Sequence, residues 1–414
     1  MTLAPAFVTD HPEEIVESGT GALAGLKVVE FAHVIAGPLA GTLLADLGAE
    51  VVHVEDPGNG DPQRGAGPTK DGTHLWWKVA ARNKRSVTLN LRTEEGRKVA
   101  RELAEWADVV ITNFRVETLE RWGLDFASLN QINPKVIVLQ VTGFGAKSSK
   151  RNQPGFGKVG EAMSGVVNIT GFPDGPPVHT GFSHGDSVTG LMGAYAIQTA
   201  LYRKAVDPDF RGEWIDLALY EGLYRLVEWQ VIFYDQLGEI PERVGNRLAA
   251  APAAVINTFR TGDDRWLTVT SGTPRSVRNV AALVGEPAED YATAADQVAR
   301  RDRLDALVAD WISQRPLDEC MKVMIELEVV ASPILTVEDI LEDPTYRENG
   351  NIVTLEDPDL GPVRMQGVVP RLTNYPGAVR HTAPALGADN DHVYSGYLGK
   401  SDGELADLRS AGNI

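Results

Sequence analysis

Short apolar runs alternate with longer helical stretches through the first half of the chain. The run Leu26–Phe31 is typical of a buried strand, Ala36–Leu47 of a helix, and Glu50–Glu55 of a second strand. This order forms a βαβ unit, which predicts parallel strand pairing. The pattern predicts further strands at residues 86–91, 108–112, 136–141 and 214–219, and helices at 93–106, 190–204 and 220–237. We therefore expect a Rossmann-like, doubly wound α/β domain over residues 26–237.

The pattern changes after Leu237, where Pro, Gly and a run of Ala mark a linker. Two strands are expected at residues 253–260 and 266–271 around a Gly-Asp-Asp turn, followed by helices near 277–283, 293–314 and 317–328. Residues 238–331 therefore predict a smaller α+β domain. The segment 332–414 is rich in Pro, Gly and Asp and ends in a helical stretch at 402–410.

Charge and composition narrow the class of protein. The chain has 414 residues, is 43% hydrophobic and 23% charged, and carries a net charge of −18. That charge argues against nucleic acid or an anionic membrane as the main partner. No apolar run is long enough for a membrane span, and residues 1–25, read as an N-terminal arm, lack the pattern of a signal peptide. With Cys320 as the single cysteine, these features predict a cytoplasmic protein.

The segment Gly181–Gly190 places one carboxylate, Asp186, among small residues just before an apolar helix. Small neighbours let a bulky substrate approach, and a helix N-terminus favours negative charge. Both features suit a carboxylate nucleophile. The alternative is that Asp186 only caps the helix, since Asp is a favoured cap residue.

Basic residues gather at the expected strand-to-helix junctions. The group comprises Arg82, Lys84, Arg85, Arg115, Arg121 and Lys158. Such cations suit phosphate groups, although each one taken alone is also typical of a solvated surface. The first strand-to-helix turn lacks the G-x-G-x-x-G spacing of a nicotinamide or flavin site, so we expect a nucleotide held in another way. The histidine spacing predicts no metal site.

Several segments together resemble the family III CoA-transferases, a group that includes formyl-CoA transferase, carnitine CoA-transferase and α-methylacyl-CoA racemase. The similarity extends from Leu26 to the C-terminus. The segments that carry it are 26–38, 47–51, 58–61, 83–86, 108–114, 119–123 and 181–190.

The resemblance implies a site, an assembly and a substrate. It maps the catalytic nucleophile onto Asp186 and a pocket carboxylate onto Glu161, beside which we expect His184 and Gly185 to line the substrate pocket. It maps CoA contacts onto His33, Val34, Ala36, Lys84, Arg85, Asn113, Phe114, Arg121 and Lys158. It also implies an interlocked homodimer, a C-terminal segment 332–414 that returns to the large domain, and no permanently bound cofactor. Acyl-CoA and a free carboxylic acid are the implied substrates.

Departures from the family pattern keep alternatives open. Residues 244–271 have no match to the glycine-rich loop of the formyl-CoA enzyme, which makes formyl-CoA and oxalate doubtful substrates. Residues 158–163 lack the racemase signature G-H-D-[IL]-N-Y. We therefore expect CoA transfer through an aspartyl-CoA intermediate. Racemisation or epimerisation of an α-methylacyl-CoA, and CoA or nucleotide binding without chemistry, are the alternatives.

Overall fold

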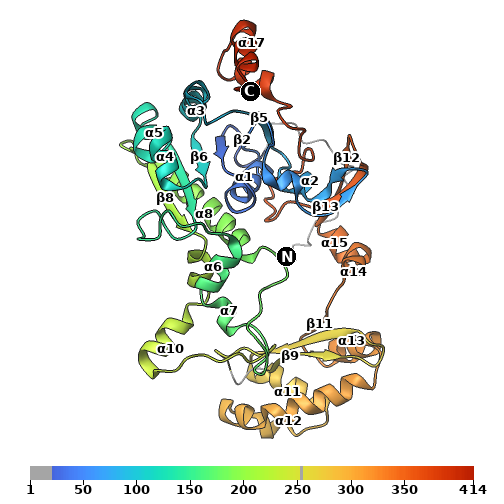
Figure 1. The fold of residues 1–414 in the computed structure, drawn as a ribbon. Helices are drawn as coiled ribbons and strands as arrows, with labels where there is room; N and C mark the ends of the chain where they lie inside the picture. The colour runs from blue at the N-terminus through green and yellow to red at the C-terminus, as the bar shows by residue number, and fades with distance from the viewer. Residues whose placement is uncertain (1–20, 252–254) are drawn as a thin grey trace, which may run out of the picture. The chain divides into compact units, whose positions relative to one another are not determined.

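The structure is a computed structural model that describes residues 21–251 and 255–414 (Figure 1). These residues belong to two compact units, and we describe each by itself. The first consists of residues up to 160, 183–223 and 347–414, and the second of residues 161–182 and 224–346. Most of the expected arm at 1–25 lies outside the described residues. The domain limits expected at residues 237 and 331 stay predictions.

A six-stranded parallel sheet forms the centre of the first unit. Its strand order is β5-β2-β1-β6-β7-β8. The strands are β1 (Lys27–Phe31), β2 (Glu50–Glu55), β5 (Arg85–Thr88), β6 (Val109–Thr112), β7 (Ile137–Thr142) and β8 (Glu213–Ala218). The chain runs from β1 to one edge and then returns to the other side of β1, which is the doubly wound order. The predicted α/β class with a parallel sheet is confirmed.

Helices cover both faces of this sheet, which explains why β6 and β7 are buried along their whole length. One face packs against α1 (Ala36–Asp46) and α8 (His184–Val206). Glycines let these two helices approach closely, because a Cβ at Gly190 would stand 2.9 Å from the Ala36 carbonyl oxygen. The other face packs against α3 (Glu94–Trp106), whose N-cap Thr93 matches the predicted helix start.

The remaining elements of the first unit include the C-terminal return. Asp389 accepts the Ser86 N–H at 2.9 Å, and the Tyr394 hydroxyl donates to the Thr88 carbonyl at 2.7 Å. The last residues of the chain therefore cover β5, the edge strand. The elements are a short 3₁₀ helix (Pro62–Gly65), β3 (Thr69–Lys70), β4 (Thr73–His74), α2 (Leu75–Ala80), α4 (Val116–Trp122), α5 (Phe126–Ile132), β12 (Ile352–Asp357), β13 (Gly361–Gln366), α16 (Asn390–Gly396) and α17 (Asp402–Ser410).

The second unit is built on an antiparallel sheet of order β11-β10-β9. Its strands are β9 (Val255–Arg260), β10 (Trp266–Ser271) and β11 (Ala331–Pro333), and its other elements are α7 (Val166–Ile169), α10 (Trp229–Leu237), α11 (Pro274–Leu283), α12 (Ala294–Ser313), α13 (Leu317–Glu326) and α14 (Val337–Glu342). Cys320 is fully buried in its core, in keeping with a packing role. Three helices cross or touch the division between the units: α6 (Gly157–Met163), α9 (Glu221–Leu226) and α15 (Pro344–Glu348).

Two helices differ from the sequence-based prediction. The helix expected over residues 220–237 is divided into α9 and α10, and no Gly or Pro marks the interruption in the sequence. The helix expected from Gly190 begins at His184 instead. Glycine and serine are poor helix formers, so local propensity favoured the later start.

Candidate active site

The candidate site lies where the sheet reverses its strand order. The turn after β1 carries His33 and Val34, and the turn after the neighbouring strand β6 carries Asn113 and Phe114. In doubly wound sheets, ligands bind in the crevice at the carboxyl ends of the two strands that flank this reversal. The strand order therefore predicts a ligand site at these turns.

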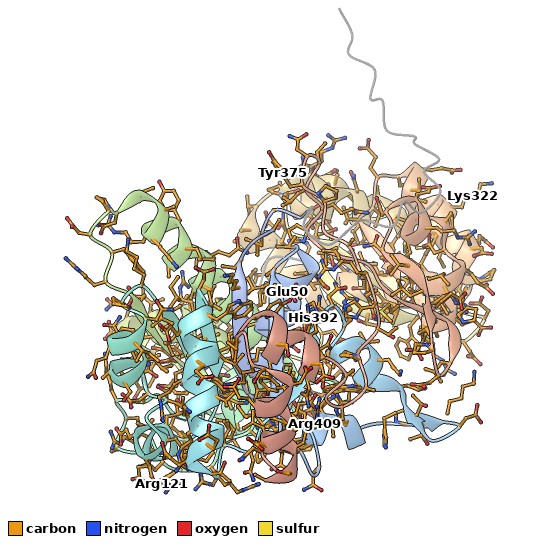
Figure 2. The ribbon with its side chains drawn as sticks, turned by 90° about the horizontal axis from the view of Figure 1, so that it is seen from above. Glu50, Arg121, Lys322, Tyr375, His392 and Arg409 are labelled. Carbon is orange, nitrogen blue, oxygen red and sulfur yellow. The ribbon has the colours of Figure 1, made fainter. Side chains whose placement is uncertain are left out.

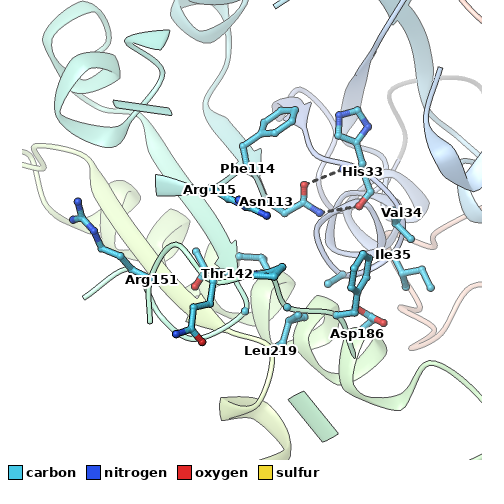
Figure 3. Close-up of a pocket in the computed structure, with 17 residues that line it drawn as sticks. His33, Val34, Ile35, Asn113, Phe114, Arg115, Thr142, Arg151, Asp186 and Leu219 are labelled. Carbon is cyan, nitrogen blue, oxygen red and sulfur yellow. Dashed lines mark hydrogen bonds between the residues drawn. The ribbon is translucent and has the colours of Figure 1, made fainter. Parts of the chain in front are cut away.

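A cavity of about 280 Å³ opens at this place (Figure 3). It is shaped by the turns after β1, β6 and β7 together with the start of α8, and all of its lining belongs to the first unit. The residues that line it are His33, Val34, Ile35, Ala36, Asn113, Phe114, Arg115, Val141, Thr142, Gly143, Arg151, Gln153, Pro154, Gly155, Phe156, Asp186 and Leu219.

Asp186 contributes the carboxylate of this cavity. It is half-buried and occupies the first turn of α8, three residues after the N-cap Ser183. The prediction that Asp186 lies just before the helix is therefore wrong, because the residue lies within the first turn and is not the N-cap. In the first turn, the partial positive charge of the helix N-terminus still favours a carboxylate.

Gly157 lies directly against this carboxylate. A Cβ at Gly157 would stand 2.0 Å from Asp186 Oδ2 and 2.6 Å from its Cγ. The same loop is held close to β7, because a Cβ at Gly155 would stand 2.6 Å from the Gly143 Cα. The glycine-rich stretch noted in the sequence therefore brings backbone, without side chains, up to the Asp186 carboxylate.

His33 and Asn113 join the two turns at the strand reversal. The His33 N–H donates to Asn113 Oδ1 at 3.0 Å, and Asn113 Nδ2 donates to the His33 carbonyl at 2.8 Å (Figure 3). The imidazole of His33 meets the ring of Phe114 edge-on with centroids 5.1 Å apart. Burial lowers the pKa of His33, so this ring is neutral at physiological pH.

A second cavity of about 360 Å³ adjoins the first, since His33 and Phe114 line both. It lies beside the ends of β2 and β5, and Arg92 is the cation of its lining. Arg92 Nη1 lies 2.5 Å from Asp56 Oδ2, while 76% of the arginine side chain stays exposed. The remaining lining residues are Val54, Glu55, Asn59, Gly60, Pro62, Leu89, Leu91 and Trp122.

Of the residues predicted to contact CoA, His33, Val34, Ala36, Asn113 and Phe114 line the first cavity. Lys84 does not line either cavity: it is 1% exposed, and its ammonium donates to both carboxylate oxygens of Glu30 at 2.9 Å. Arg85 instead contacts Glu50 of β2, and Tyr397 and Asp389 of the C-terminal return. For both residues, CoA contact stays a prediction that their position in the structure does not support.

The other predicted residues lie outside the cavity linings. Arg121 is exposed at the end of α4 (Figure 2), and Lys158 is exposed on α6. His184 and Gly185 begin α8 next to Asp186. Glu161 belongs to the second unit, where it is 1% exposed and its Oε2 lies 2.7 Å from His179 Nδ1.

Several lining residues were not among the predicted CoA contacts. The most informative are the cations Arg92, Arg115 and Arg151, which line the cavities while the predicted Lys84 and Arg85 do not. Arg115 belongs to the basic group noted in the sequence, and it directly follows Asn113 and Phe114. Arg92 had a signal too, because it closely follows the expected strand 86–91, but it is separated from that basic group. His179, which contacts Glu161 but lines neither cavity, had no sequence feature apart from its residue type to suggest a functional role.

Two further observations concern the described residues as a whole. Across residues 21–251 and 255–414, no group of three or more His, Cys, Asp and Glu side chains is arranged to hold a metal ion. Within the same described ranges, no helix is long and apolar enough to cross a membrane.

The Asp186 carboxylate lies at a glycine-lined helix start, at the strand reversal of a doubly wound sheet. Both cavities beside it contain cations. Together these features define a class of α/β proteins with a site of a size for a nucleotide. Comparison with known proteins identifies the family. The model of CoA-transferase family III matches residues 23–390, and the chain belongs to this family. It is a CoA-transferase by this match and by its named relatives.

Named relatives cover almost the whole chain. The succinyl-CoA–D-citramalate CoA-transferase of Chloroflexus aurantiacus is 39% identical over 93% of this chain and 96% of its own length. The β subunit of the succinyl-CoA–L-malate CoA-transferase of the same organism is 35% identical over 94% of this chain and 97% of its own. A formyl-CoA:oxalate CoA-transferase of Rhodopseudomonas palustris is 30% identical over 95% of this chain and 98% of its own.

A solved structure supports the same assignment. A CAIB/BAIF family protein from Brucella suis superposes with a TM-score of 0.79 at 33% identity, covering 91% of this chain and all of that one. The Rv3272 protein of Mycobacterium tuberculosis superposes with a TM-score of 0.76 at 24% identity, covering 91% of this chain and 99% of that one, which shows the shared fold.

Proposed function

We propose that this protein transfers CoA from an acyl-CoA to a free carboxylic acid through a covalent aspartyl-CoA intermediate on Asp186. The observation that carries the proposal is the position of the Asp186 carboxylate: it lies in the cavity at the strand reversal, at a helix N-terminus, with Gly157 against it. A nucleophilic carboxylate must be charged and open to a thioester carbonyl, and these three features favour both conditions.

The proposed reaction exchanges acyl groups in balanced steps. An Asp186 oxygen attacks the thioester carbonyl of the donor and expels the CoA thiolate, which leaves a mixed anhydride. The thiolate attacks the aspartyl carbonyl and releases the donor acid, giving aspartyl-CoA. The acceptor carboxylate attacks this thioester and expels the CoA thiolate, which leaves a second mixed anhydride. The thiolate then attacks the acceptor carbonyl of this anhydride. The products are the new acyl-CoA and a regenerated Asp186 carboxylate.

The chain supplies electrostatic support for these steps. Gly185 and Asp186 lie in the first turn of α8, where backbone N–H groups point away from the body of the helix. Such groups suit the oxyanion of each tetrahedral intermediate, and one donor of this kind is typically worth about 3 kcal/mol. The neutral His33 adds no positive charge to the cavity wall, so it does not neutralise the attacking carboxylate.

The two adjoining cavities suit a long ligand with phosphates. We assign the thioester end of CoA to the cavity of Asp186 and the nucleotide end to the cavity of Arg92. The part of CoA that links the two ends would pass His33 and Phe114, which line both cavities. Arginine binds phosphate through a planar fork of donors, so Arg92 is the proposed phosphate contact. The apolar Leu89, Leu91 and Trp122 of the second cavity suit a flat base.

The relatives indicate which substrates to test first. Relatives that are 33–39% identical over 93–94% of this chain have names that pair succinyl-CoA with D-citramalate or L-malate. The formyl-CoA:oxalate enzymes are 30–31% identical. Together with the unmatched formyl-CoA loop, this supports succinyl-CoA as donor and a hydroxy-dicarboxylic acid as acceptor.

We also propose that two copies of the chain associate. Leu191, Tyr195 and Tyr202 repeat at helical spacing along α8, and 57%, 69% and 71% of them are exposed in the single chain. An apolar stripe of this kind is typical of a surface that another chain covers. Light scattering of the wild-type protein and of Tyr195→Glu tests this: a dimer for the first and a shift toward monomer for the second are expected.

One experiment tests the proposed chemistry. The protein is incubated with succinyl-CoA, treated with hydroxylamine and analysed by peptide mass mapping. A hydroxamate at Asp186 is expected, and Asp186→Ala should show neither the adduct nor turnover. Solvent deuterium incorporated at the α-carbon of a branched acyl-CoA, with no adduct at Asp186, would support racemisation instead.

A further inference from the structure

Beneath the first cavity, four charged side chains form a continuous buried chain. Lys84 Nζ lies 2.9 Å from both carboxylate oxygens of Glu30, and Glu30 Oε2 lies 2.7 Å from His53 Nδ1. His53 Nε2 lies in turn 3.2 Å from Asp61 Oδ2. All four residues are at most 1% exposed. Burying four charged groups costs free energy, so each group needs well-placed partners to offset that cost.

The last member of this chain holds a backbone amide of the site. Both carboxylate oxygens of Asp61 accept the N–H of Val34, at 3.0 and 3.1 Å. Val34 has φ of 68°, in the left-handed region that β-branched residues rarely adopt. Such a conformation is energetically unfavourable for a β-branched residue and persists only where the surroundings enforce it.

The strained residue is part of the cavity wall. Val34, with Ile35 and Ala36, lines the cavity that contains Asp186. Asn113 accepts the His33 N–H and donates to the His33 carbonyl. Asp61 accepts the N–H of the same His33–Val34 peptide group, so this peptide is held at both its carbonyl and its amide. The turn is thus clamped by two side chains, and the Asp61 carboxylate is itself held by His53 at 3.2 Å and by the N–H of Gln63, which it accepts at 2.8 Å.

The surroundings of His53 favour its protonated form. Glu30 from β1 and Asp61 from the loop after β2 contact its two ring nitrogens, and Glu55 on β2 and His33 lie near enough to influence its charge. The pKa of His53 is about 9, because hydrogen bonds and charges from these carboxylates outweigh its burial. A protonated imidazole donates a hydrogen bond to Glu30 through Nδ1 and forms an ion pair with Asp61 through Nε2, so its charge joins the two carboxylates.

We propose that His53 is a positioning residue of the acyl-CoA site: by bridging Glu30 and Asp61 it keeps Asp61 on the Val34 amide and holds the left-handed turn against the Asp186 cavity. The part of this inference that concerns acyl-CoA rests on the proposed function. The part that concerns the turn does not.

Hydrogen exchange at the Val34 amide tests the turn directly. His53→Gln removes the bridging charge, and we expect exchange at this amide to be about tenfold faster than in the wild type. His392→Gln is the matched control, because His392 is exposed and bonds only to Tyr397 among the contacts described (Figure 2). If His53→Gln fails to fold, Asp61→Asn is measured instead. Exchange within about twofold of wild type in a folded variant would overturn the inference.

Binding of CoA, measured by calorimetry, tests the link to the site. We expect His53→Gln to raise the Kd for CoA about fivefold, with a smaller effect when Val34→Gly is also present. Glycine adopts a left-handed φ at little cost, so the double variant no longer needs the clamp. An equal loss with and without Val34→Gly would mean that His53 acts only through general stability. If the wild type fails to bind CoA, the proposed function is wrong, and the exchange result still decides the role of His53 in the turn.

Discussion

The Asp186 carboxylate and the backbone of Gly157 are in direct contact: a Cβ at position 157 would stand 2.0 Å from Asp186 Oδ2. The two residues come from separate helices, and the absence of a side chain on one leaves space for the carboxylate of the other. Because the contact involves the atom proposed to attack the thioester, its geometry matters for rate as well as for packing.

Replacing Gly157 with Ala should therefore impair catalysis. The new methyl group forces the Asp186 carboxylate out of its position, and a displacement of about 1 Å at a reacting group can cost about a hundredfold in rate. The measurement is kcat with succinyl-CoA, accompanied by thermal unfolding. The control is Gly403→Ala on α17, where a Cβ meets nothing within 4 Å. Unchanged kcat in Gly157→Ala would show that Asp186 does not need this space.

Arg92 and Asp56 should have opposite effects on CoA binding. Arg92→Gln removes the proposed phosphate contact, and about a tenfold higher KM for acyl-CoA is expected at unchanged kcat. Asp56→Asn removes a carboxylate that both pairs with Arg92 and repels phosphate, so a lower KM is expected. Arg409→Gln, on the exposed helix α17, is the control. Changes of the same sign in both variants would argue against phosphate binding at this place.

Lys84 should contribute to stability instead of CoA contact. Lys84→Met removes one of the two cations that pair with the buried Glu30 carboxylate and leaves only His53, and breaking a buried pair in this way costs about 3–5 kcal/mol. Urea denaturation should therefore show a large loss of unfolding free energy, and exposed Lys322→Met should show almost none (Figure 2). A folded Lys84→Met of normal stability with a raised KM for acyl-CoA would instead restore the original assignment.

His53 should make stability depend on pH in the alkaline range. Its pKa is about 9 in the folded protein against 6.5 for an ordinary histidine, so the folded state holds a proton that the unfolded state loses. Its contribution is complete below pH 6.5 and is lost as the pH rises through 9. Urea denaturation of the wild type and His53→Gln across this range should show the decline only in the wild type. Parallel curves for the two proteins would contradict the charged bridge.

Local patterns predicted the sheet well and the cation positions poorly. The runs that became β1, β2 and β6 are short and rich in Val, so their composition identifies them as strands without tertiary information. The turns after two of those strands, with His33 and Asn113, followed from the same pattern. Lys84 is different: its charge suggests phosphate, but only the fold shows that Glu30 and the Pro38 carbonyl already bind its ammonium.

Contacts distant in sequence explain the remaining differences. Gly157 and Asp186 are 29 positions apart, which is the difference between their residue numbers, and nothing in either segment indicates that they touch. The helix containing Asp186 begins earlier than propensity predicts, since Gly185 and Gly190 weaken the local signal while close packing against α1 favours the helix. Tertiary packing routinely outweighs propensity in this way.

The central claim is that Asp186 carries the CoA group, and isotope transfer tests it most directly. An acceptor acid whose carboxylate contains heavy oxygen is turned over with succinyl-CoA, and the Asp186 peptide is then analysed by mass spectrometry. In the proposed steps, one acceptor oxygen bridges the second anhydride and stays on Asp186 when CoA leaves with the acyl group. The account predicts heavy oxygen on Asp186 after turnover. Complete turnover with unlabelled Asp186 would contradict it.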